Sequence, residues 1–231
     1  MAFEILKPEW GAERPIRGIL FDMDGLVLDT EKLFTRFWME ASQLHGYPMT
    51  RQQALGMRSL SKTAGQQQLE SYFGPRINYA EIRATRIRLM SAFIAENGVE
   101  PKPGIYRLLD WLDAHNIPAA ITSSSPTDRI EQYLKPLNLY HRFQKICSGH
   151  EVPRGKPEPD IYLYGAAQLG LHPEECLALE DSPAGILSAY RAGCLPVMIP
   201  DQDQPTEETL PLLYGKADSL AEIIFFLKQE A

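Results

Sequence analysis

The order of apolar segments after Pro101 constrains the fold of this chain more than any other feature. Short apolar runs typical of buried strands alternate there with stretches typical of helices. We expect strands at about 118–122, 145–148, 176–180 and 195–199, and helices at about 105–115, 126–134, 160–169, 183–192 and 219–228. Because parallel strands need long crossover connections, this alternation predicts an α/β fold. We expect a doubly wound, Rossmann-like parallel sheet with helices on both faces.

One more strand precedes this series, at about 17–22, and two acids follow its apolar part. Asp22 and Asp24 are two positions apart, so in an extended chain their carboxylates point to the same side. Gly25 then allows a sharp turn. Two like charges held together are unfavourable unless a cation or a shared proton relieves them, and a hard divalent ion bound through oxygen, Mg²⁺, is the simplest relief. A polar turn without function is the plainer interpretation, which the motifs described below oppose.

The region between the first strand and Pro101 contains helical patterns and no strand pattern. Apolar residues recur there at three and four positions, and Gly, Asn or Pro residues close the segments. We expect helices at about 31–44, 51–55, 61–73 and 79–96. This region therefore predicts a small all-helical domain of residues 31–99, inserted after the first strand into a core domain of residues 1–30 and 100–231. Residues 1–15 show no period and are expected to form a loosely attached arm.

The charge of the chain excludes some classes of function. The chain has 231 residues, is 44% hydrophobic and carries a formal net charge of −7, which argues against a general nucleic-acid or membrane-surface binder. Residues 32–98 hold nine Lys or Arg and four Glu, so the insertion is basic and the remainder is acidic. Two explanations stay open: helices favour Arg and Glu, or the insertion is a basic lid over an anionic substrate.

The cysteines and the apolar segments bear on cellular location. Cys147, Cys176 and Cys194 match no zinc or redox spacing, so we expect reduced thiols in a cytoplasmic protein. No segment approaches the roughly 20 apolar residues of a membrane span, and the N-terminus lacks the pattern of a secretion signal. We therefore expect no membrane partner. The oligomeric state stays open, a monomer included.

Hydroxyl residues follow the strand expected at 118–122. Ser123, Ser124 and Ser125 precede Pro126, which is favoured at the first position of a helix. A helix N-terminus offers N–H groups and a partial positive charge that suit a phosphate, so we expect Ser123 to hold a phosphoryl oxygen. Ser125 is expected to cap the helix, with Asp128 completing a capping box. Capping alone would explain this pattern, and the two roles can coexist.

Two more motifs lie where a doubly wound sheet places its ligands. Lys156 is bracketed by Gly155 and Pro157, which fix the backbone around a cation. Glu180 and Asp181 end the strand expected at 176–180 and can approach the first acidic pair from a neighbouring strand. A solvated lysine and a helix start are the plainer interpretations of each motif alone. Four such motifs in one chain favour a single site for phosphate and a divalent cation.

In this order, Asp22-Met-Asp-Gly25, Ser123, Lys156 and Glu180-Asp181 make the chain resemble the haloacid-dehalogenase-like hydrolase superfamily. The helical insertion resembles the cap of its β-phosphoglucomutase-like branch. The resemblance implies that Asp22 is a nucleophile that forms an aspartyl phosphate and that Asp24 is the general acid and base. It also implies phosphate binding by Ser123, Ser124 and Lys156, and Mg²⁺ binding by Asp22, the Asp24 carbonyl, Asp181 and Glu180.

The resemblance leaves three functions to weigh. A mutase of this branch would carry a cap arginine where Ser59 stands, and the arginine here is Arg58, one position earlier; it would also carry a histidine where Phe34 stands. Both departures favour a phosphatase that acts on small phosphorylated metabolites such as sugar or nucleoside phosphates. Arg58 is the candidate for substrate binding from the cap. A sugar phosphomutase and a non-catalytic phospho-ligand-binding protein remain the alternatives.

Overall fold

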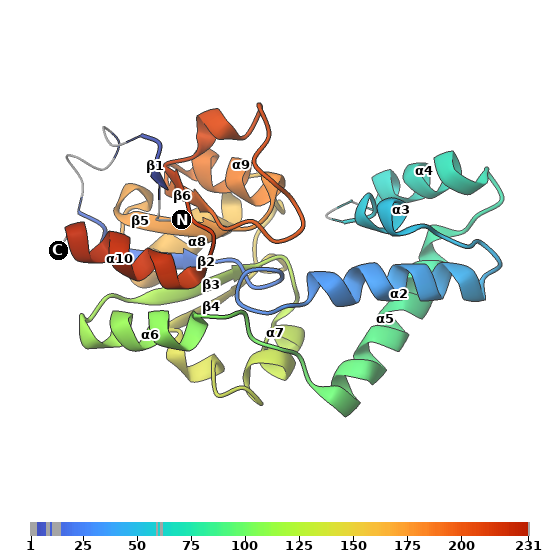
Figure 1. Cartoon of the computed structure of the whole chain (residues 1–231), viewed down its shortest axis with the longest axis horizontal. Coiled ribbons are helices and arrows are strands. Elements are labelled where there is room, and N and C mark those ends of the chain that lie inside the picture. Colours follow the sequence, from blue (N-terminus) through green and yellow to red (C-terminus); the bar gives the residue numbers. More distant parts are fainter. Residues whose placement is uncertain (1–3, 8–9, 11–14, 59, 61, 231) are drawn as a thin grey trace. The chain divides into compact units, whose positions relative to one another are not determined.

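The computed structural model describes residues 4–7, 10, 15–58, 60 and 62–230. The chain divides into two compact units (Figure 1). The core unit comprises residues 1–28 and 101–231, and the cap unit comprises residues 29–100. Within the described ranges, no helix combines the length and the apolar character that crossing a bilayer would require.

The core unit is built on a seven-stranded sheet with the order β1-β7-β6-β5-β2-β3-β4. All neighbouring strands are parallel except β1, which runs antiparallel to β7. The expected α/β fold with a largely parallel sheet is therefore confirmed. The strands are β1 (Glu4–Ile5), β2 (Gly18–Phe21), β3 (Ala119–Ser123), β4 (Lys145–Ser148), β5 (Cys176–Glu180), β6 (Leu195–Met198) and β7 (Gly215–Lys216).

The edge formed by β1 and β7 was not expected from the sequence. Residues 1–15 were predicted to be a loosely attached arm, and this is wrong for Glu4 and Ile5, which pair with Lys216 and Gly215. The N–H of Leu6 also donates to the Tyr214 carbonyl at 2.9 Å. Two-residue strands carry no readable alternation, so only the tertiary pairing defines them. Residues 1–3, 8–9 and 11–14 of the predicted arm lie outside the described residues.

The helices of the core unit follow the predicted alternation, and their bounds differ from the expected ones by at most two residues. They are α6 (Ile105–Ala114), α7 (Thr127–Leu134), α8 (Asp160–Leu169), α9 (Pro183–Ala192) and α10 (Leu220–Glu230). Short 3₁₀ turns at Tyr140–Arg142, Pro173–Glu175 and Leu210–Leu212 connect the remaining segments.

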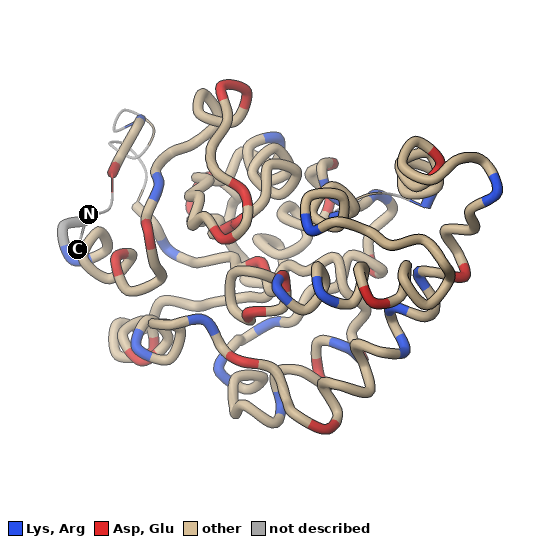
Figure 2. Tube along the Cα trace, turned by 45° about the vertical axis from the view of Figure 1, so that its right-hand side comes forward, with Lys and Arg blue, Asp and Glu red and all other residues tan. Residues whose placement is uncertain are grey.

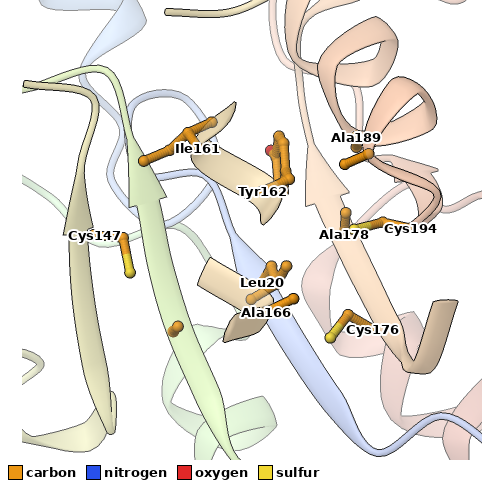
Figure 3. Close-up of a cluster of buried hydrophobic side chains, with 11 residues drawn as sticks. Leu20, Cys147, Ile161, Tyr162, Ala166, Cys176, Ala178, Ala189 and Cys194 are labelled. Carbon is orange, nitrogen blue, oxygen red and sulfur yellow. The ribbon is translucent and has the colours of Figure 1, made fainter. Parts of the chain in front are cut away.

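Both faces of the sheet are buried, as a doubly wound fold requires. Leu20 of β2 and Ala178 of β5 pack with Tyr162 and Ala166 of α8 in one apolar cluster (Figure 3). On the other face, Phe21 meets Phe143 edge-on, with ring centroids 5.5 Å apart. The carboxyl ends of β2, β3 and β5 are therefore fixed by packing from both sides.

The described residues of the cap unit form four helices, as the sequence predicts: α2 (Glu31–Leu44), α3 (Arg51–Leu55), α4 (Lys62–Phe73) and α5 (Tyr79–Asn97). Their shared core includes Trp38, Ala54, Leu69 and Ile82. The helix expected from residue 61 begins at Lys62 in the structure, and Ser61 itself lies outside the described residues. Figure 2 shows the charged residues along both units, including the basic residues of the cap helices.

Candidate active site

The turn after β2 presents the first two acids. The backbone N–H of Asp22 donates to the Leu179 carbonyl of β5 at 3.0 Å, so the parallel ladder holds Asp22 at the strand end. Gly25 has φ of 91°, a conformation that favours glycine, and its N–H donates to the Leu28 carbonyl at 2.8 Å. The turn is thereby closed, with Asp22 buried and Asp24 half-buried.

The strand register brings the predicted motifs to one edge of the sheet. Phe21 is paired with Leu179 on one side and with Ile121 on the other. The residues that follow each of these are therefore neighbours as well, which places Asp22 between Glu180 and Thr122. This arrangement explains why segments that are far apart in the sequence contribute to one site.

Lys156 reaches this edge from the loop that precedes α8. Its ammonium group donates to Asp22 Oδ1 at 2.6 Å, to Glu180 Oε1 at 2.6 Å and to the Thr122 carbonyl at 3.0 Å. The loop is itself anchored to α9, because Ser188 Oγ donates to the Glu158 carbonyl at 2.6 Å. All three N–H groups of the ammonium therefore have acceptors, which fixes its direction.

Glu180 is completely buried and is held from several sides. Besides Lys156, its carboxylate accepts a hydrogen bond from the Tyr162 hydroxyl at 2.5 Å and from Ser182 Oγ at 3.1 Å. The first turn of α9 lies directly against it, since a Cβ atom on Gly185 would come within 1.9 Å of the Glu180 carboxyl group. The position of Glu180 is therefore determined by α8 and α9 together.

The acids form a cluster that suits a hard cation. Among the described residues, carboxylate oxygens of Asp22, Glu180 and Asp181 lie within 4.8 Å of one another, and all three residues are buried. Oxygen ligands at this spacing fit Mg²⁺ better than a soft metal. The single ammonium group of Lys156 faces more than one buried acid here. A bound cation would balance the negative charge that remains on these acids.

The electrostatics of Asp22 agree with this chemistry. The pKa of its carboxyl group is raised from 3.8 to about 7, chiefly by burial; Lys156 opposes this shift, and the neighbouring Glu180 and Asp24 add to it. The pKa of Lys156 is raised as well: burial alone would lower it, but Asp22 and Glu180 outweigh that effect. Lys156 therefore stays charged, whereas Asp22 needs a cation to be fully ionised near neutral pH.

The serines after β3 divide into three environments. Ser123 is buried and its Oγ accepts from the Ser125 N–H at 3.0 Å, which leaves its own O–H available as a donor. Ser124 is exposed. Ser125 was expected to cap the following helix, and this is wrong: Pro126 is the N-cap of α7, with no side-chain cap bond. The Ser125 hydroxyl donates instead to Asp24 Oδ2 at 3.0 Å.

The predicted cap residues lie within the cap unit. Arg58 Nε donates to the Leu55 carbonyl at 3.1 Å, and its Nη1 lies 3.7 Å from Glu31 Oε2. Phe34 is half-buried beneath the guanidinium of Arg86, at 4.7 Å from the ring centroid. Ser59, at the position of the mutase arginine, lies outside the described residues. The role of Arg58 in substrate binding stays a prediction.

Sequence reasoning did not single out Tyr162 or the contact between Ser125 and Asp24. Tyr162 is the third residue of α8, where an aromatic residue looks like an ordinary core residue. Its helical position predicts burial, but not the direction of its hydroxyl. The sequence pattern around Ser125 predicts a helix cap and does not indicate its hydrogen bond to Asp24.

The model of the haloacid dehalogenase-like hydrolase family matches residues 19–199 of the chain. The chain belongs to this family. Members of the family related to it include the "Probable pseudouridine-5'-phosphatase" of Drosophila melanogaster, which is 34% identical over 85% of this chain and 87% of its own length. Hexitol phosphatase A of Escherichia coli (strain K12) is 36% identical over 77% of this chain and 80% of its own length.

A solved structure shares the fold of this chain. The crystal structure of CbbY from Rhodobacter sphaeroides in complex with phosphate superimposes with a TM-score of 0.72. The match covers 90% of this chain and 96% of the CbbY chain at 24% sequence identity, so it bears on the fold alone.

Proposed function

We propose that this protein is a Mg²⁺-dependent phosphatase that hydrolyses small phosphomonoesters through an aspartyl phosphate. Membership of a hydrolase family with phosphatase relatives gives the class, a phosphoric monoester hydrolase. The observation that carries the proposal is the buried contact between the Lys156 ammonium and Asp22, at the edge of the sheet where Glu180 and Asp181 also lie. A carboxylate beside a fixed cation is suited to attack a phosphoryl group.

In the first step, a carboxylate oxygen of Asp22 forms a bond to phosphorus while the ester P–O bond breaks. The leaving alkoxide takes a proton from Asp24, whose side chain is oriented by the Ser125 hydroxyl. In the second step, Asp24 removes a proton from water as the water oxygen attacks phosphorus. The bond between Asp22 and phosphorus then breaks, which releases inorganic phosphate and restores both acids.

The remaining residues stabilise charge on the transferred group. We assign the Ser123 hydroxyl and the Lys156 ammonium to the phosphoryl oxygens, with the exposed Ser124 beside them. Asp22, Asp181, the Asp24 carbonyl and Glu180 are the groups that would hold or adjoin Mg²⁺, which would supply charge neutralisation for phosphoryl transfer.

Hydrolysis is favoured over a phosphomutase reaction by the environment of Arg58. A mutase must hold a second phosphate group in its cap, whereas the Arg58 guanidinium is directed to Leu55 and Glu31 of the cap itself. Phe34, at the position of the mutase histidine, offers no ionisable group. The phosphomutase is thus the second candidate, supported by the helical cap and by a relative named β-phosphoglucomutase in Bacillus subtilis (strain 168).

The substrate class follows from the relatives rather than from the core geometry. The named relatives act on pseudouridine 5'-phosphate and on hexitol phosphates, so we propose sugar or nucleoside monophosphates as substrates. We also propose a cytoplasmic location, supported by the free and buried thiols of Cys147, Cys176 and Cys194.

The test is phosphate release from p-nitrophenyl phosphate and from a panel of sugar and nucleoside monophosphates, with Mg²⁺ and with EDTA. We expect Mg²⁺-dependent turnover that Asp22→Asn abolishes and that Asp110→Asn, at an exposed acid, leaves unchanged. Wild-type rates in Asp22→Asn would refute the proposal. Conversion of glucose 1-phosphate to glucose 6-phosphate faster than its hydrolysis would put the phosphomutase first.

A further inference from the structure

The hydroxyl of Tyr162 is directed at the polar side of the site, although its ring belongs to the apolar core. Tyr162 has no exposed surface and packs with Leu20, Ala166 and Ala178 (Figure 3). A phenylalanine would fill nearly the same volume there, so packing alone does not require the hydroxyl. A buried hydroxyl is unfavourable without a partner, and this one donates to Glu180 Oε1 at 2.5 Å.

The same oxygen of Glu180 accepts the ammonium of Lys156, at 2.6 Å. Tyr162 therefore contacts the pair from two directions, because its ring also lies beneath the ammonium, with Nζ 5.0 Å from the ring centroid. The other oxygen of Glu180 is occupied by Ser182. Removing the Tyr162 hydroxyl would leave Oε1 with Lys156 as its hydrogen-bond donor and allow the carboxylate to rotate.

A rotation of Glu180 would be passed on to Asp22. The Lys156 ammonium has three hydrogens and donates them to Asp22, Glu180 and the Thr122 carbonyl. Because the three N–H bonds have a fixed geometry, a shift of one acceptor turns the ammonium group and changes the directions of the other two N–H bonds. The hydrogen bonds form a continuous chain from Tyr162 through Glu180 and Lys156 to Asp22. Tyr162 stands at the end of this chain that is farthest from Asp22.

We propose that Tyr162 is a positioning residue for the reaction: through Glu180 it holds Lys156 in the direction that aligns the Asp22 carboxylate for attack. This role rests on the proposed phosphatase function. Tyr162 does not touch the phosphoryl group, so it affects the alignment of the nucleophile more than the binding of substrate.

The first test compares Tyr162→Phe with Tyr164→Phe, a half-buried tyrosine on the same helix whose hydroxyl has no hydrogen bond to another described residue. We expect Tyr162→Phe to lower kcat by about tenfold to a hundredfold and to leave KM within about twofold, since misalignment affects the chemical step. Tyr164→Phe should match the wild type. Unchanged kcat in Tyr162→Phe would overturn the proposal.

A double-mutant cycle separates positioning from loss of packing. If Tyr162 acts through Glu180, Tyr162→Phe should lower kcat little further when Glu180→Gln is already present. Two fully multiplicative effects would contradict the proposal, because they would mean that Tyr162 acts independently of Glu180.

A measurement without turnover distinguishes this proposal from the proposed function. In protein labelled with ¹⁵N-lysine, the buried and hydrogen-bonded Lys156 ammonium should give a slowly exchanging NMR signal. We expect the signal in the wild type and in Tyr164→Phe, and a shifted or broadened signal in Tyr162→Phe. An identical signal in Tyr162→Phe would overturn the positioning role, whereas absent phosphatase activity in the wild type would refute the proposed function and leave this comparison valid.

Discussion

The Nζ atom of Lys156 lies 2.6 Å from Oδ1 of Asp22, although 134 positions separate the two residues in the chain. The same ammonium balances the buried Glu180. Because a buried charge is unfavourable unless it is paired, the ammonium group and the two acids depend on one another for their positions. Their removal one at a time should therefore have separable effects on activity and on stability.

Replacement of Lys156 tests the catalytic side of this relationship. Lys156→Met should lower kcat by about 10²- to 10³-fold, because it removes a fixed cation from the phosphoryl group and the nucleophile. Lys145→Met, at an exposed lysine, is the matched control and should retain wild-type kcat. Steady-state assays with p-nitrophenyl phosphate give both values, and a drop of less than threefold in Lys156→Met would contradict the assignment.

Asp24 is proposed to protonate the leaving group, so its effect should depend on that group. Asp24→Asn should slow hydrolysis of an alkyl sugar phosphate by about 10²- to 10⁴-fold. With p-nitrophenyl phosphate, it should slow the first step, formation of the aspartyl phosphate, by a smaller factor, since nitrophenolate leaves without a proton. The formation of the aspartyl phosphate, followed as a burst of nitrophenolate, isolates this step. Equal losses in that step for both substrates would argue against the acid role.

The hydrogen bond from Ser125 to Asp24 makes a further prediction. Ser125→Ala should lower kcat for sugar phosphates by about tenfold, because the general acid loses the donor that orients it. Ser125→Thr, which keeps a hydroxyl at the same position, should recover most of the activity. If both variants behaved alike, the hydroxyl would have no part in orienting Asp24.

The raised pKa of Asp22 predicts a dependence of stability on pH. Without metal, the folded protein binds the Asp22 proton more tightly than the unfolded chain does, since burial and the neighbouring acids outweigh Lys156 and move the pKa from 3.8 to about 7. The resulting contribution to the free energy of unfolding is complete below about pH 4 and is lost as the pH rises to about 7. Urea denaturation in EDTA should show this loss, on the order of 4 kcal/mol, in the wild type relative to Asp22→Asn. Parallel pH profiles of the two proteins would be inconsistent with a raised pKa.

Gly185 allows a prediction about packing against Glu180. Gly185→Ala would place a Cβ atom within 1.9 Å of the buried carboxyl group, so α9 or Glu180 must move. We expect a loss of about 1–3 kcal/mol in the free energy of unfolding, together with reduced kcat. Gly155→Ala, where no atom lies within 4 Å of the added Cβ and no positive φ is required, should change stability little. Thermal or urea denaturation measures both.

The sequence was sufficient to predict the α/β fold and the elements that carry the site, because strand ends in a parallel sheet meet at one edge. Asp22 and Glu180 could be assigned to one pocket for this reason, whereas Lys156 was assigned to it from its Gly155 and Pro157 neighbours and from the resemblance to the family. The pairing of β1 with β7 could not be predicted, since two-residue strands have no periodicity of their own.

The direction of individual side chains could not be predicted from the sequence either. Ser125 before Pro126 matches a helix cap, yet the structure turns its hydroxyl to Asp24. Tyr162 matches a core position in α8, and nothing in a helical pattern indicates where a phenol group points. Contacts of this kind depend on the approach of elements that are distant in sequence, which local patterns do not contain.

The cap unit is joined to the core unit by two neighbouring chain segments. Leu28 pairs with Pro101 in an antiparallel bridge, and the Lys102 N–H donates to the Val27 carbonyl at 2.8 Å. Because the two ends of the insertion are adjacent, a short turn could replace all of it without altering the strand register of the sheet. The insertion can thus change in length and sequence during evolution while the register that places Asp22 between Glu180 and Thr122 stays the same.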